Sequence, residues 1–134
     1  MMYVGQKASV KKRFYEKEVS DFSAMTMDKN LIHIDTEYAK GTRFGQRIVQ
    51  GPMVAAMIGG ILGSDLPGNG TIYISQETRF LKPVYINEEI TASVQIEHIR
   101  EDKNIITLRT WVEKENGDIV LDGKAVVLHL SDNI

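Results

Sequence analysis

The sequence of 134 residues contains no cysteine and no long hydrophobic run. Without cysteine there is no disulfide framework, no thiolate nucleophile and no cysteine-based zinc site. The longest apolar stretch, residues 52–63, is well short of the roughly 20 residues that span a bilayer, so we expect a buried helix there. The first residues also lack the apolar core of a secretory leader, which predicts a cytoplasmic protein.

An excess of one charge sign is also lacking, because 16 basic and 18 acidic residues leave a formal net charge of -2. This balance argues against a protein that binds nucleic acid or an anionic membrane through a broad charged surface. The contents of hydrophobic residues, 43%, and of charged residues, 25%, are ordinary for a globular chain. We therefore expect one domain over residues 1–134 that folds without a metal, and we predict neither a metal site nor a cofactor.

Residue periodicity predicts helices in the first half of the chain. A short edge strand is expected up to Arg13, followed by a helix over residues 16–26 and a short helix from Thr36 to Gly41. Pro52 at a first helical position predicts a third helix, which is apolar on nearly every face and should therefore be enclosed. The alanines and glycines of this third helix would allow a sheet to approach it closely.

The second half of the chain alternates between apolar and polar residues over four segments. These predicted strands cover residues 71–81, 89–99, 104–114 and 119–130. We expect a four-stranded antiparallel meander, with a type I′ hairpin turn at Asn116-Gly117 and a bulge at Asp122-Gly123. Helices followed by strands predict an α+β fold, in which a curved antiparallel sheet packs on a central helix.

Asp28 and His33 are the residues best suited to acid–base chemistry. They lie in a stretch that the polar pair Lys29-Asn30 interrupts, and a turn there could aim both side chains at one point. Histidine titrates near neutral pH, so the two groups could handle the protons of one water molecule. By spacing alone, a helix cap or a structural hydrogen bond is the more common explanation of such a pair.

The start of the apolar helix offers a binding site for a developing negative charge. The first amides of a helix are unpaired and carry the positive end of the helix dipole. Pro52 has no N–H, so the amide of Gly51 is the donor at the mouth of this site, and glycine lets a ligand approach closely. The same Gly51-Pro52 pair is also an ordinary signal for the start of a helix.

Several motifs, taken in sequence order, resemble the MaoC-like (R)-specific enoyl-CoA hydratases. They are D-K-N-L-I-H from Asp28 to His33, A-K-G-T-R-F-G-Q-R-I-V-Q-G-P-M from Ala39, L-P-G-N-G from Leu66 and R-F-L-K-P-V from Arg79. The resemblance covers nearly the whole chain. It implies a single MaoC-like hot-dog domain, a long helix wrapped by an antiparallel sheet, that works as a homodimer. It also implies that Asp28 and His33 are catalytic and that Gly51 and Asn30 contribute to oxyanion or substrate binding.

The sequence departs from the family pattern at two positions. Leu31 stands where the family commonly has proline, which removes a rigid turn residue but keeps Asn30 before it. Gln50 stands where the family commonly has histidine, so a proton-linked role is lost there, while the Gly51 amide is retained.

The resemblance implies hydration of a trans-2-enoyl-CoA to an (R)-3-hydroxyacyl-CoA, a reversible reaction. Acyl carrier protein could also carry the acyl group, because it presents the same pantetheine arm as CoA. Two other functions stay open: a hot-dog thioesterase, which would release free thiol, and a non-catalytic acyl-thioester binding subunit. The phosphates of CoA require local positive charge. The basic residues that could supply it are Arg43, Arg47, Arg79, Lys82, Arg100 and Lys103.

Overall fold

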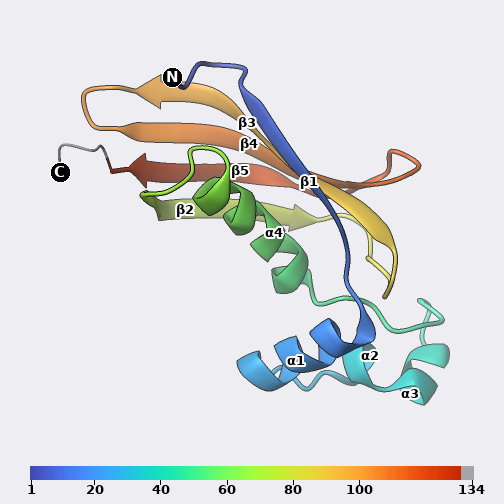
Figure 1. Ribbon diagram of the computed structural model, residues 1–134. Helices are drawn as coiled ribbons and strands as arrows, with labels where there is room; N and C mark the ends of the chain where they lie inside the picture. Colours follow the sequence, from blue (N-terminus) through green and yellow to red (C-terminus); the bar gives the residue numbers. More distant parts are fainter. Residues whose placement is uncertain (131–134) are drawn as a thin grey trace.

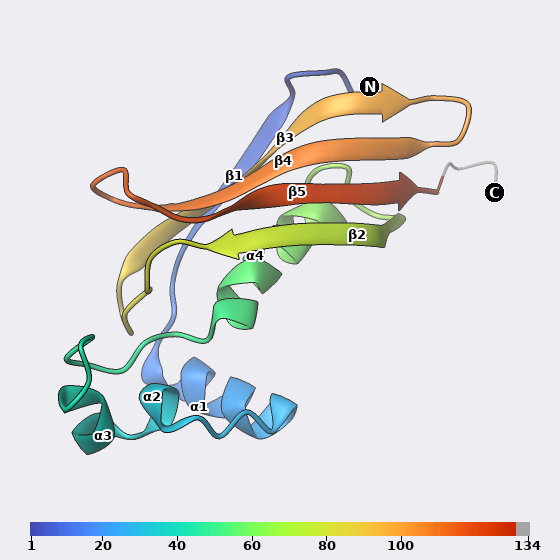
Figure 2. The same cartoon turned by 180° about the vertical axis from the view of Figure 1, so that it is seen from behind.

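The computed structural model describes residues 1–130, in which one curved sheet and four helices occur (Figure 1). In chain order the elements are β1 (Lys7–Arg13), α1 (Glu16–Thr26), α2 (Leu31–Ile34), α3 (Thr36–Lys40), α4 (Gly51–Ser64), β2 (Thr71–Phe80), β3 (Glu89–Arg100), β4 (Ile105–Lys114) and β5 (Ile119–His129). The sheet curves over α4, and the three shorter helices gather beyond the N-terminal end of α4. Figure 2 shows the same arrangement from behind.

Neighbouring strands of the sheet are all antiparallel, in the order β1-β3-β4-β5-β2. β1 is an edge strand, as predicted, and β3, β4 and β5 form a meander. The predicted four-stranded meander is wrong for one strand, because β2 pairs with β5 and not with β3. Alternation of residues determines which face of a sheet a side chain takes, but it does not determine which strand lies beside which.

The hydrophobic core lies between α4 and the concave face of the sheet. Ile58, Ile61 and Leu62 of α4 are almost completely buried there, in one cluster with strand residues such as Ile90 and Leu108. The predicted fold class, an α+β hot-dog fold with a long helix wrapped by an antiparallel sheet, is confirmed. Within residues 1–130, no helix is both long enough and apolar enough to cross a membrane.

The outer face of α4 is less enclosed than its sequence predicts. Pro52, Ala56 and Gly60, which are spaced about one helical turn apart, are exposed in the single chain. The expectation that the helix is covered on every side is therefore only partly right. The sheet covers one side of α4 and leaves this stripe of small residues open.

The turn between β4 and β5 differs from the predicted type I′ turn. A type I′ turn needs positive φ at both central residues, and of the two only Gly117, with a φ of 89°, has it. The amide of Gly117 donates to the carbonyl of Lys114 at 3.0 Å, and the amide of Lys114 donates to the carbonyl of Asp118 at 2.9 Å. The hairpin is confirmed, with a longer loop that ends in a left-handed glycine.

The bulge predicted at Asp122-Gly123 does not occur. Both residues keep a regular register with β2 and with β4. A side chain at position 123 would overlap the carbonyl oxygen of Glu77 in β2. The glycine is therefore explained by the close approach of a neighbouring strand and not by a bulge.

Candidate active site

Asp28 lies in the short connection between α1 and α2, where local hydrogen bonds hold it. The hydroxyl of Ser23 in α1 donates to the Asp28 carbonyl, and the Asn30 amide donates to Asp28 Oδ1 at 3.1 Å. Met27, just before it, has a left-handed φ of 63° and ends α1. These contacts hold the Asp28 backbone and one carboxylate oxygen, and they leave Oδ2 free to face His33.

α2 is a single helical turn that the sequence did not predict, and it carries His33. The Asn30 side chain caps this turn, because its Oδ1 accepts a hydrogen bond from the Ile32 amide at 3.2 Å. His33 is buried, and its Nδ1 lies 2.8 Å from the carbonyl oxygen of Ile48. A carbonyl oxygen can only accept, so Nδ1 carries the hydrogen and Nε2 is the lone-pair nitrogen of the neutral ring. The predicted role of Asn30 in substrate binding stays a prediction.

The two predicted catalytic side chains face each other. His33 Nε2 and Asp28 Oδ2 are 3.8 Å apart, and the Asp28 side chain is 40% exposed. This distance allows an ion pair when the ring is protonated, but it is too long for a direct hydrogen bond. A carboxylate and a neutral Nε2 are both acceptors, and one water molecule has two protons to offer them. The geometry can therefore hold a water molecule and remove one of its protons.

Gly51 begins α4, and its amide is directed away from the helix. The carbonyl of Gln50 accepts hydrogen bonds from the amides of Met53 and Val54, and these are the first two hydrogen bonds of the helix. Pro52 has no N–H, and within residues 1–130 the Gly51 amide has no hydrogen-bond partner. The N-terminal end of α4 thus presents one free donor together with the positive end of the helix dipole.

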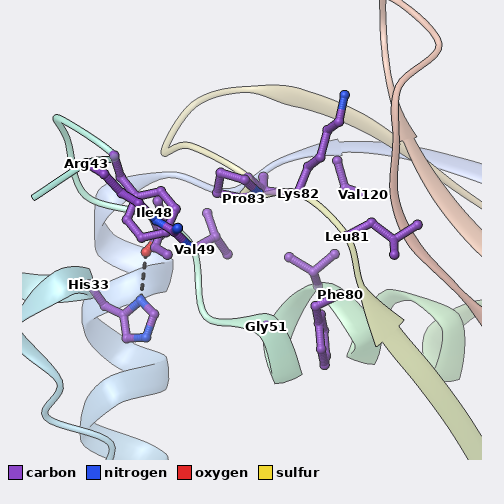
Figure 3. A pocket seen from close by; sticks show the side chains of 13 residues that line it. His33, Arg43, Ile48, Val49, Gly51, Phe80, Leu81, Lys82, Pro83 and Val120 are labelled. Atoms are coloured by element: carbon purple, nitrogen blue, oxygen red, sulfur yellow. Dashed lines mark hydrogen bonds between the residues drawn. The ribbon is translucent and has the colours of Figure 1, made fainter.

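A pocket of about 300 Å³ brings His33 and Gly51 together (Figure 3). The same pocket is lined by apolar side chains, among them Phe44, Val54 and Phe80. Asp28 does not line this pocket and lies beside His33 instead. An apolar cavity with one imidazole and one free amide suits a mostly apolar ligand that carries a carbonyl group.

α1 holds both parts of this site through hydrogen bonds that sequence analysis missed. Gln50 is completely buried, and its Nε2 donates to the Val19 carbonyl at 2.9 Å. Ser23, one turn later on the same buried face of α1, donates to the Asp28 carbonyl. The sequence signal for this face is the spacing of Val19 and Ser23, but nothing local indicates their partners.

Two of the six basic residues named above, Arg43 and Lys82, line the pocket. Lys82 lies 3.1 Å from Asp118, and its hydrogen bond holds the pKa of that carboxyl group below its usual range. Arg47 is already engaged in an ion pair with α1 at 2.7 Å. Arg43 lies over the ring of Phe44 at 5.0 Å, and the part of the chain that the structure describes holds no ion-pair partner for it. Arg43 is therefore the basic residue at this pocket most available to a phosphate.

Comparisons with known proteins all find similarity to MaoC-like domains and (R)-specific hydratases. The family model described as "MaoC like domain" matches residues 4–117. The (R)-specific enoyl-CoA hydratase of Aeromonas caviae is 43% identical over 124 residues, which cover 92% of this chain and 92% of that protein. The (R)-specific enoyl-CoA hydratase of Rhodospirillum rubrum is 36% identical over 124 residues, covering 92% and 85%. A solved structure, the (R)-hydratase from A. caviae involved in PHA biosynthesis, matches with a TM-score of 0.94 at 41% identity, covering 96% of this chain and 98% of that chain.

Proposed function

The chain belongs to the MaoC-like domain family, and on that premise we propose that it is an (R)-specific hydratase that adds water to trans-2-enoyl thioesters of CoA. The observation that carries the proposal is the pocket shared by His33 and the free Gly51 amide, with Asp28 beside the imidazole. Hydration of a conjugated thioester needs a proton acceptor, a proton donor and a group that stabilises the enolate oxygen. These three residues supply those functions.

In the proposed mechanism, Asp28 Oδ2 and the neutral Nε2 of His33 each accept one hydrogen bond from the attacking water. The water oxygen bonds to C3 of the enoyl group while Nε2 takes one of its protons, and the electron pair of the double bond moves toward the thioester carbonyl. The Gly51 amide and the dipole of α4 stabilise the oxygen as it becomes negative. The imidazolium, stabilised by the Asp28 carboxylate, then returns a proton to C2, which leaves the enzyme unchanged and gives the 3-hydroxyacyl thioester.

CoA is the carrier that we propose for the acyl group. Arg43 and Lys82 line the same pocket as His33 and Gly51, and Arg43 is free of an ion pair with residues 1–130. A guanidinium group binds a phosphate through paired hydrogen bonds, so Arg43 is suited to the phosphates of a CoA thioester. Acyl carrier protein offers a single phosphate on the same arm, and CoA offers three.

We also propose a homodimer that forms through β2. As an edge strand, β2 has one row of backbone amides and carbonyls without sheet partners among the strands of residues 1–130. Its residues Ile72, Tyr73 and Ile74 are 50%, 47% and 54% exposed, which is unusual for large apolar side chains in sequence. A second copy of β2, paired antiparallel, would satisfy the edge and cover these side chains. Phe80 lines the pocket at the end of β2, so the partner would lie close to the site.

The test is an assay of crotonyl-CoA that follows loss of the enoyl absorbance and release of free thiol in parallel. For the wild type we expect loss of absorbance without thiol. Asp28→Asn and His33→Gln should each lose about 10²- to 10⁴-fold in kcat, the range typical of a removed acid–base group. Asp65→Asn and His98→Gln, at exposed positions away from the pocket, are matched controls that should retain activity.

The other two outcomes of this assay identify other functions. Thiol release in step with loss of substrate would identify a thioesterase. Neither loss of absorbance nor thiol release, together with tight binding of crotonyl-CoA in a separate titration, would identify an acyl-thioester binding subunit. Either result would refute hydration as the function of this site.

A further inference from the structure

Gln50 immediately precedes the proposed oxyanion donor and is completely buried. We propose that Gln50 is a positioning residue, whose hydrogen bond to α1 fixes the Gly51 amide relative to Asp28 and His33. This inference rests on the hydratase function proposed above, and it assigns a role to a residue that touches neither water nor substrate.

The first support is the set of contacts that Gln50 completes. Its Nε2 donates to the Val19 carbonyl of α1 at 2.9 Å, and its own carbonyl accepts the first two hydrogen bonds of α4. The side chain thus joins the N-terminal end of α4 to α1. One turn further along α1, Ser23 donates to the Asp28 carbonyl. α1 is therefore tied to both the proposed donor helix and the proposed acid–base segment.

The second support is that Gln50 is a poor choice for stability alone. Its Oε1 is buried and has no hydrogen-bond partner in the described part of the chain. Turning the amide around would put Oε1 against the Val19 carbonyl oxygen, so the observed orientation is the favourable one. A buried polar group without a partner is destabilising, and an apolar side chain of the same length would avoid that penalty. The N–H donor is what an apolar replacement could not provide.

The other hydrogen bonds of residues 48–51 do not connect this segment to α1, and only the Gln50 side chain makes that connection within residues 1–130. His33 Nδ1 binds the Ile48 carbonyl, and the Val49 amide donates to the Val84 carbonyl at 2.7 Å. These bonds hold residues 48 and 49, but within residues 1–130 the Gly51 amide has no partner of its own. Without the Gln50 bond, no hydrogen bond within residues 1–130 would join the N-terminal end of α4 to α1, and only side-chain packing would fix their separation. Misplacement of a catalytic group by about 1 Å can reduce the rate about 10²-fold.

The experiment compares Gln50→Met with Gln50→His in the full-length protein. Methionine matches glutamine in length but cannot donate, whereas histidine keeps an N–H donor. We expect Gln50→Met to keep or raise Tm, because it removes the unpaired acceptor. Its kcat for crotonyl-CoA should fall at least about tenfold while KM changes less than about threefold, as expected for a loss felt mainly in the transition state. Gln50→His should recover most of kcat.

Two results would overturn the proposal. One is a wild-type kcat in Gln50→Met. The other is a loss of kcat that parallels a loss of Tm and that Gln50→His does not reverse, since that would describe a purely structural residue.

A measurement without substrate separates this proposal from the proposed function. The Gly51 amide resonance, followed by NMR, should shift in Gln50→Met and return toward its wild-type position in Gln50→His. If the wild type proves inactive as a hydratase while the resonance behaves in this way, the positioning role stands and the proposed function fails. If the resonance is the same in all three proteins, the positioning role is refuted whatever the activity.

Discussion

Replacing Gly51 by alanine tests whether the backbone amide at the start of α4 is the oxyanion donor. Gly51 is the first residue of the helix, so its backbone conformation is one that alanine adopts without strain. The added Cβ would lie 3.0 Å from Cε1 of Phe80 and 3.3 Å from Cδ1 and Cζ. These contacts are too close, but the Phe80 side chain is at the end of β2 and 55% exposed in the single chain, so within one protomer the ring has room to turn away.

The expected effects on stability and activity are therefore different in size. Relief of the contact should cost about 1 kcal/mol or less, partly offset by the better helix propensity of alanine, so Tm should change by less than about 5 °C. Alanine keeps the backbone amide, but its methyl group and a displaced Phe80 ring would both crowd the pocket beside that amide, so we expect them to keep a thioester oxygen away from it. Loss of one oxyanion donor costs about 10²- to 10³-fold in kcat, and we expect a loss of about 10²-fold here.

The assay is hydration of crotonyl-CoA, with thermal unfolding measured on the same samples. Gly63→Ala is the matched control, because a Cβ at this α4 glycine meets no atom within 4 Å. We expect this control to keep its activity. A folded Gly51→Ala protein with the kcat of the wild type would refute the assignment of the Gly51 amide as the oxyanion donor.

Three further predictions concern the substrate, the assembly and the response to pH. Arg43→Gln should raise KM for crotonyl-CoA about tenfold but leave crotonyl-pantetheine, which has no phosphate, unaffected, and Arg79→Gln, which lies outside the pocket, should change neither. Ile74→Lys should convert the proposed dimer to monomer in sedimentation experiments, because it places a charge on the β2 edge. Hydrogen bonds from Lys12 and a backbone amide hold the pKa of Glu18 below its usual range, so the stabilisation is present at neutral pH and is lost as pH falls through that lowered pKa. Glu18→Gln should therefore lower Tm at pH 7 by a degree or a few, with no difference from wild type near pH 3.

The sequence predicted the elements of the fold better than their arrangement. The spacing of apolar residues and the acidic residues of the first turn predicted α1 over the range that is observed. Pro52 predicted the start of α4 to within one residue. α2 was missed because a helix of four residues is too short to show a period. The position of β2 beside β5 was also missed, since strand order depends on contacts between segments that are far apart in the chain.

The candidate site also has features that the sequence predicts and features that depend on the fold. Asp28, His33 and Gly51 could be named from residue type, the helix-start signal and the order of motifs. The tautomer of His33 could not be predicted, because it depends on a hydrogen bond to the Ile48 carbonyl, which the fold brings beside α2. The choice of Arg43 among six basic residues likewise depends on which of the others are engaged in ion pairs or lie away from the pocket.

Gln50 has a role in the structure that its comparison with the family's histidine did not predict. In the sequence its notable property is that it cannot titrate, and glutamine is most often a surface residue. In the structure the same side chain is buried and donates to Val19, a contact between two helices that no local pattern encodes. Because Ser23 on the same face of α1 holds Asp28, the separation between the Asp28 carboxylate and the proposed oxyanion donor, the Gly51 amide, depends on α1 as much as on α4. Substitutions on this face of α1 should therefore change kcat without touching the pocket.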